Sequence, residues 1–279
     1  MKMKNVLVCS MVASLCFVAC DTNIPNTNEN TTNTQNGVIT AGAFSVVSDK
    51  QVFFSVGNLQ YQASTQTWRF ADRQYEFVGA SNQNISNTYS DWIDLFGWGT
   101  GDIPTKMSTS DDAYTVFIDW GDNAIANGGN KSNQWRTLTG QEWHYIFTQR
   151  PNATRLYGAA TIRTDKADIC GIVILPDEWN TPDKLVFSPN VTEWLANTFD
   201  AVQWAQMEQA GAVFLPAAGD REEGTQVQNI QSTGYYWSST MCEDGSGASA
   251  FAFGGGEIYP SMCNSRNCGF SIRLVQDIK

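Results

Sequence analysis

Two cysteines five positions apart, Cys263 and Cys268, lie near the end of the chain in the stretch CNSRNCGFSIRLV. Thiols in such a pair could react in an enzyme, form a structural disulfide, or remain reduced on a binding surface. A reactive thiol needs an electropositive setting, because the thiolate is the nucleophile. Arg266 supplies one positive charge, but the chain has 28 Asp and Glu against 17 Lys and Arg. We therefore favour a Cys263–Cys268 disulfide over a catalytic pair, with reduced thiols as the remaining alternative.

The other candidate catalytic groups are few. His144 is the only histidine, and its position in an expected helix favours a structural role over a Ser-His-Asp or metal site. Carboxylates at Asp91, Asp94, Asp111 and Asp112 could bind calcium, but the sequence motifs of calcium-dependent lectins are absent. The many acidic residues could supply the two carboxylates of a glycoside hydrolase, yet no pair is singled out. We predict no catalytic residue, no metal and no cofactor.

Residues suited to ligand recognition gather between Gly234 and Gly269. Tyrosine and tryptophan give large contact area at low entropic cost, and Ser and Asn adapt their hydrogen bonds, as in antibody paratopes. The predicted ligand-binding residues are Tyr235, Trp237, Glu257, Tyr259, Ser261, Asn264, Arg266 and Asn267. We expect these side chains to be exposed, except that Trp237, like Phe251, has an alternative interpretation as core. Arg273 is expected to be a structural ion partner.

Helix and strand patterns indicate how these residues are positioned. Thr139 and Glu142 form a capping box, followed by an apolar face and ended by Pro151. Asp200 with Gln203 announces a second helix that ends before Gly211. Residues 42–71 predict consecutive antiparallel strands, and CGIVILP, GAVFLP, GYYWSST, ASAFAFGGGEIY and GFSIRLV predict further short strands. DWIDLFGWGTGD, which begins at Asp91, predicts an irregular, aromatic-packed loop because glycines lie between its tryptophans. The order of elements indicates an α+β fold with long loops.

The N-terminus predicts export and lipid attachment. A basic head and a short apolar run in residues 1–19 are typical of a signal peptide, and FVAC resembles a bacterial lipobox that would be lipidated at Cys20, with palmitate among the acyl chains. Residues 20–37, rich in Asn and Thr, predict a disordered tether. The domain would span 38–279, with N-terminal strands and loops in 38–130 and a core in 131–279. An exported chain with Cys170, Cys242, Cys263 and Cys268 permits two disulfides in three connectivities, which stay open.

The net charge of the chain argues against two classes of partner, nucleic acids and anionic lipids. Removing residues 1–19 would leave 15 Lys and Arg against 28 Asp and Glu, a net charge of −13. A chain with this negative charge is unsuited to binding nucleic acid or to binding anionic lipids through lysine and arginine side chains. We expect the lipid to be the sole membrane attachment.

Three segments together resemble a known family. TLTGQEWHYIFTQR resembles a helix of formylglycine-generating sulfatase-modifying factors, while VFLPAAGDREEG with GYYWSST, and the terminal GFSIRLV, resemble C-type-lectin-like domains of bacterial surface lipoproteins. That group includes the Fibrobacter major paralogous domain proteins and the variable proteins of diversity-generating retroelements, such as the phage tropism determinant. The likeness covers roughly residues 131–279. It implies a C-type-lectin-like fold, in which two helices and small twisted antiparallel sheets support a loop-rich face.

The resemblance leaves two functions open. One is a non-catalytic, adhesin- or receptor-like binding domain at the cell surface or outer membrane, with a protein or glycan ligand at the loops between Gly234 and Gly269. The other is an oxidoreductase of the modifying-factor type that uses Cys263 and Cys268. Modifying factors have two cysteines at this spacing, but there a further segment separates the pair from the terminal strand, whereas Cys268 adjoins Gly269. We therefore expect a binding domain.

Overall fold

Capping boxes begin both helices, as the sequence predicts. Helix α1 (Gly140–Thr148) starts after Thr139, whose hydroxyl accepts from the Glu142 amide at 3.1 Å while the Glu142 carboxylate accepts from the Thr139 amide at 2.8 Å. Helix α2 (Ala201–Gln209) starts after Asp200 with the same reciprocal bonds to Gln203. Each box satisfies backbone amides that a first turn leaves without intrahelical partners.

The computed structural model describes residues 34–222 and 226–279, so the predictions for the signal peptide, for Cys20 and for most of the tether lie outside the described residues. The last predicted tether residues do take part in structure, because β1 (Thr34–Gln35) pairs antiparallel with β2 (Val38–Ile39). Within the described residues, no helix is long and apolar enough to cross a membrane.

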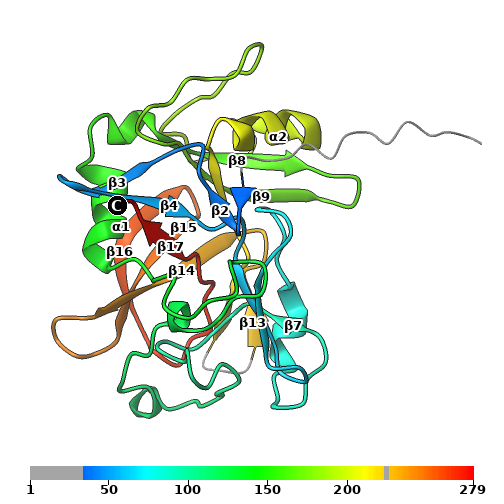
Figure 1. Cartoon of the computed structure of the whole chain (residues 1–279), viewed down its shortest axis with the longest axis vertical. Helices are drawn as coiled ribbons and strands as arrows, with labels where there is room; N and C mark the ends of the chain where they lie inside the picture. Colours follow the sequence, from blue (N-terminus) through cyan, green and yellow to red (C-terminus); the bar gives the residue numbers. More distant parts are fainter. Residues whose placement is uncertain (1–33, 223–225) are drawn as a thin grey trace, which may run out of the picture. The chain divides into compact units, whose positions relative to one another are not determined.

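Two small sheets form from the N-terminal strands. The predicted antiparallel strands of residues 42–71 are confirmed as β3 (Phe44–Val47), β4 (Lys50–Phe54), β5 (Leu59–Gln62) and β6 (Thr67–Phe70). Strand β7 (Trp92–Ile93) joins β5, and β17 (Val275–Asp277) joins β4, so the C-terminal end of the chain lies beside an N-terminal strand (Figure 1).

The middle of the chain forms a four-stranded sheet. Its order is β10-β8-β9-β11, from β8 (Tyr157–Arg163), β9 (Asp168–Ile174), β10 (Thr198–Asp200) and β11 (Val213–Pro216). The β10–β8 pair is parallel and the other pairs are antiparallel. Short 3-10 helices lie in the loops: η1 (Gly79–Gln83), η2 (Asp111–Ala113), η3 (Trp120–Asp122) and η4 (Ala153–Arg155).

The segment with the predicted ligand-binding residues forms its own antiparallel sheet. It comprises β14 (Thr233–Met241), β15 (Ala248–Gly254) and β16 (Glu257–Asn264), with β15 in the centre. A hairpin of β12 (Asp220–Glu222) and β13 (Gln226–Gln228) precedes it. One face packs on α1, where the Phe251 ring centroid lies 4.3 Å from Phe147 and 5.2 Å from Trp143. The other face places Trp237 and Ala250 in a second apolar cluster.

One predicted strand is irregular. GFSIRLV makes isolated bridges through Gly269, Phe270 and Ser271 before β17 begins at Val275. Its residues are nevertheless core, with Ile272 and Leu274 fully buried. Arg273 is buried as well, but it donates to the carbonyls of Ser55, Gln74 and Phe214 instead of pairing closely with a carboxylate, so the expected ion pair is replaced by backbone contacts.

In the described residues the fold is therefore mixed α+β, with two α-helices, several small antiparallel sheets and long connecting loops. Three apolar clusters fill it, and tryptophans are prominent in each. The aromatic-rich loop predicted after Asp91 is confirmed, because Phe96 and Trp98 are buried outside regular structure.

Candidate functional site

The predicted ligand-binding residues fall on two outer strands and a turn. Tyr235 and Trp237 lie on β14, Arg266 and Asn267 lie in the turn after β16, and the rest lie on β16: Glu257, Tyr259, Ser261 and Asn264. Burial and hydrogen bonding divide these residues into buried ones that support the fold and exposed ones that a ligand could contact.

The two β14 residues of the predicted set, Tyr235 and Trp237, pack against other aromatic residues. Trp237 is 1% exposed, and its indole N–H donates to the Phe96 carbonyl at 2.7 Å. The expectation that Trp237 contacts ligand is therefore wrong, and its alternative interpretation as core is confirmed. Tyr235 is half-buried, with its ring stacked on Phe270 at 4.6 Å, and burial raises its pKa.

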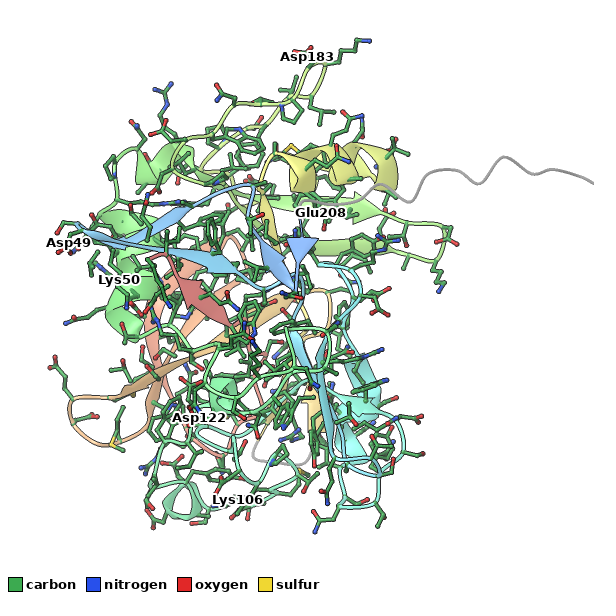
Figure 2. All side chains as sticks on the ribbon, viewed as in Figure 1. Asp49, Lys50, Lys106, Asp122, Asp183 and Glu208 are labelled. Carbon is green, nitrogen blue, oxygen red and sulfur yellow. A yellow bond between two sulfur atoms is a disulfide. The ribbon has the colours of Figure 1, made fainter. Side chains whose placement is uncertain are left out.

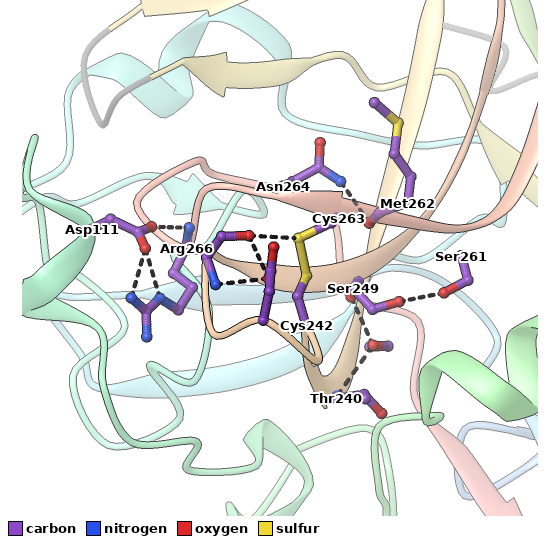
Figure 3. The surroundings of a disulfide bond; sticks show 12 residues. Asp111, Thr240, Cys242, Ser249, Ser261, Met262, Cys263, Asn264 and Arg266 are labelled. Atoms are coloured by element: carbon purple, nitrogen blue, oxygen red, sulfur yellow. Dashed lines mark hydrogen bonds and ion pairs between the residues drawn. A yellow bond between two sulfur atoms is a disulfide. The ribbon is translucent and has the colours of Figure 1, made fainter.

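Arg266 and Asn267 are also structural. Asp111 accepts from the Arg266 guanidinium at 2.8 Å (Nε) and 2.7 Å (Nη2), and from the Arg266 backbone amide (Figure 3). Asn267 donates to the Thr109 carbonyl at 2.7 Å. Both side chains are buried. The expectation that they are exposed ligand contacts is wrong, because they connect the turn after β16 to the start of η2 and to Thr109 just before it.

Strand β16 carries the exposed part of the predicted set. Glu257, Tyr259 and Ser261 are exposed, and Asn264 is half-buried with its amide donating to the Met262 carbonyl at 2.9 Å. Because β16 is an edge of its sheet, no strand among the described residues pairs with its outer side. Pro260, which has no amide hydrogen, lies where the register with β15 shifts. Proline and bulges on an edge discourage pairing with another strand, so β16 presents side chains more readily than backbone.

The disulfide differs from the predicted one. Cys263 bonds Cys242, with a Cα–Cα distance of 6.0 Å, and Cys268 remains a thiol (Figure 3). The prediction of a Cys263–Cys268 bond is therefore wrong. Cys242 directly follows β14, so the bond links the two outer strands of the sheet past its central strand.

A cleft of about 490 Å³ opens beside this bond. Its floor is the sheet, its first wall is the start of α1, and its second wall is the chain that leaves β14. The lining residues are Thr139, Gly140, Gln141, Thr240, Met241, Cys242, Glu243, Ser249, Ser261 and Cys263. In the floor, the Ser249 and Ser261 hydroxyls lie 2.8 Å apart.

Two threonine hydroxyls in the cleft walls accept hydrogen bonds from the first turn of α1. The Thr240 hydroxyl accepts from the Gly140 amide at 3.0 Å, and the Thr139 hydroxyl accepts from the Glu142 amide. A hydroxyl that accepts through a lone pair still has its own proton to donate. These groups can therefore hydrogen-bond a polar ligand without disturbing the cap of α1.

The face around the cleft is acidic. Residues 233–265 contain Glu243, Asp244 and Glu257 but no lysine or arginine. Hydrogen bonds from the Ser246 hydroxyl and amide lower the Asp244 pKa, so it stays ionised at neutral pH. The neighbouring Arg266 is paired with Asp111.

The carboxylates and the histidine considered as metal-binding or catalytic groups do not cluster into a site among the described residues. Among residues 34–222 and 226–279, no three His, Cys, Asp or Glu side chains form a metal-binding group. Asp94 is buried and accepts from Asn82 at 2.7 Å and from the Val78 amide at 2.8 Å, and burial raises its pKa to about 6. His144 lies on α1 beside Thr148. A second pocket, of about 320 Å³, lies between residues 98–106 and 113–118.

The sequence predicts little of this cleft, because Ser261 is the single predicted ligand contact among its ten lining residues. Thr139 is predictable as a helix cap, but nothing local indicates that the first turn of α1 packs against a sheet formed about a hundred residues later in the chain. The stretch from Thr240 to Glu243 lies within the predicted recognition segment, where Cys242 is a candidate disulfide cysteine and none of the four is a predicted ligand contact.

Comparison with known proteins gives one match. Residues 192–275 match a family model described as a domain of unknown function (DUF8237). No match was found among curated proteins or solved structures. The matched segment includes α2 and the sheet β14–β16 but not α1, so the cleft lies partly inside and partly outside it.

Proposed function

We propose that this chain is a non-catalytic ligand-binding domain of a surface lipoprotein, anchored through Cys20 at the outer membrane or cell surface. Its fold would be of the C-type-lectin-like type. Ligand would bind at the cleft and at the exposed side chains of β16, with Glu257, Tyr259 and Ser261 kept from the predicted set. Trp237, Arg266 and Asn267 serve as scaffold.

The cleft is the observation that carries this proposal. It lies on the segment where the sequence places recognition residues, and its hydroxyl groups retain donors for a ligand. The disulfide in its wall limits how far the outer strands can separate, and a preorganised site loses less entropy on binding. The partly buried Asp111–Arg266 pair holds the turn that follows β16.

The enzymatic alternative depends on Cys263 and Cys268 acting together. In this structure Cys263 is bonded to Cys242, so that bond would have to be reduced or exchanged before the pair could react. No observation favours this alternative, and it is left as an outcome of thiol-dependent activity assays.

A blocking substitution tests the proposal. Gln141 is exposed, lines the cleft and lies on the first turn of α1, so Gln141→Trp should fill the cleft while the protein stays folded. Gln206→Trp, at an exposed position of α2, is the matched control. Purified full-length chain and both variants would be applied to protein and glycan arrays. We expect ligands that the wild type and Gln206→Trp capture and that Gln141→Trp does not. Capture that Gln141→Trp leaves unchanged would refute the cleft as the site.

A further inference from the structure

The groups lining the cleft restrict the ligand class. Its ten described lining residues offer hydroxyls, one amide, one carboxylate, a thioether and a disulfide, but no aromatic ring and no basic side chain. A sugar ring commonly places its apolar face on an aromatic side chain, which this lining does not provide. An anionic ligand would meet Glu243 without a cation to balance it. Extended peptide backbone, with alternating donors and acceptors, suits hydroxyls and an amide.

The charges around the cleft favour a cationic occupant. Glu243 lines the cleft and the exposed Asp244 follows it, while Glu257 is exposed at the other end of β16. The cations beside the first turn of α1 are engaged elsewhere, because Lys50 and Arg136 both pair with Glu142 and Asp277. The carboxylates at the cleft are therefore available to a partner.

Exposed apolar atoms at the cleft add to its surface. Met241, which lines the cleft, is 38% exposed, whereas Tyr259 and Met262 pair across the sheet with Ala252 and Ala250, on the face away from Ser249 and the cleft floor. Methionine adapts to irregular partners and can cover the aliphatic stem of lysine or arginine. Pro260 and the bulge disfavour a strand added through its backbone, so recognition would proceed through side chains.

We propose that the cleft and its acidic wall, Glu243 and Asp244, bind a basic, extended peptide segment of a partner protein. This inference rests on the proposed function and names its ligand class. Arginine or lysine side chains of the partner pair with Glu243 and Asp244, while its backbone bonds the hydroxyls of the cleft. Electrostatic attraction also speeds the encounter, because the whole chain carries a net charge of −11.

The test uses three synthetic peptides on one Gly/Ser/Ala scaffold, with four arginines, four glutamates or no charge, titrated against the full-length protein by fluorescence anisotropy. The cleft variant is Glu243→Lys with Asp244→Lys. The control is Glu178→Lys with Asp183→Lys, which changes the net charge equally on another loop, where Asp183 lies at the loop's outer end (Figure 2). We expect the arginine peptide to bind tightest, the cleft variant to weaken it about tenfold, and the control to change it less than threefold.

The outcomes separate this inference from the proposed function. Equal weakening by both variants would show attraction to the net charge alone and overturn the inference. So would a neutral peptide or a glycan that binds as tightly as the arginine peptide and is blocked by Gln141→Trp, although the proposed function would then stand. If none of the peptides or array glycans bound in a Gln141→Trp-sensitive manner, both would fail. Thermal melts of all variants check that each remains folded.

Discussion

The Cys242–Cys263 bond gives the sharpest prediction for stability. The two cysteines are 21 positions apart. In the loop-closure model, a crosslink over a loop of this size removes denatured-state entropy worth about 3 kcal/mol. Replacing both cysteines by serine should therefore lower the free energy of unfolding by about 3 kcal/mol. For a domain of this length, such a change lowers Tm by about 6–12 °C.

Thermal melts followed by tryptophan fluorescence measure this change, with reductant as an internal control. Reductant should lower the wild-type Tm to that of the double variant and should leave the double variant unchanged. Peptide mapping under non-reducing conditions checks the connectivity independently. A crosslinked peptide joining Cys263 to Cys268, or a double variant as stable as the wild type, would refute the reasoning.

Two further predictions concern a scaffold residue compared with a surface residue, and a buried acid. Arg266→Ala should cost about 2 kcal/mol in a denaturant titration, because it leaves a partly buried Asp111 without its partner. Tyr259→Ala, at an exposed position of β16, should change stability by under about 1 kcal/mol; equal stability losses would contradict the division. Burial raises the Asp94 pKa to about 6, so between about pH 4 and 6 the folded state holds a proton that the unfolded state has lost. Relative to Asp94→Asn, the wild type should therefore gain about 2 kcal/mol of stability as pH falls from 7.5 to 4.5, and parallel stability profiles of the two proteins would contradict this.

Both helices were predictable because their signals are local. Each capping box lies within four residues, and the hydrogen bonds it implies are those that the structure shows. The antiparallel strands between residues 42 and 71 also follow from short-range alternation and turns. The aromatic loop after Asp91 was predictable from its glycines and tryptophans, although its partners were not.

The disulfide was not predictable, since it depends on sheet register. Ala248 pairs with Met241 on one side and with Asn264 on the other, which brings Cys242 and Cys263 together. Both pairings follow register shifts, and no residue pattern located those bulges. The five-residue spacing of Cys263 and Cys268 is compatible with a disulfide. It relates two positions in β16 and the turn after it, whereas the observed bond joins β16 to the residue that directly follows β14.

The scaffold role of Arg266 was hidden for a similar reason. An arginine between serine and asparagine in a loop-rich segment looks exposed, and its partner Asp111 is 155 positions earlier. Burying a charge requires a partner, so exposure was the simpler expectation until the fold brought the two segments together.

Gly140 shows how closely folding and recognition are connected in this protein. A Cβ atom at this position would lie 2.6 Å from the Ser249 hydroxyl oxygen and 3.4 Å from that of Ser261. The absence of a side chain therefore lets the first turn of α1 approach the floor of the sheet, where the Gly140 amide donates to Thr240. The same close approach sets the width of the cleft, and the threonine hydroxyls on both walls can each donate to a ligand. The Thr139 cap, Gly140 and the Cys242–Cys263 bond each stabilise the fold, and together they define the shape of the cleft.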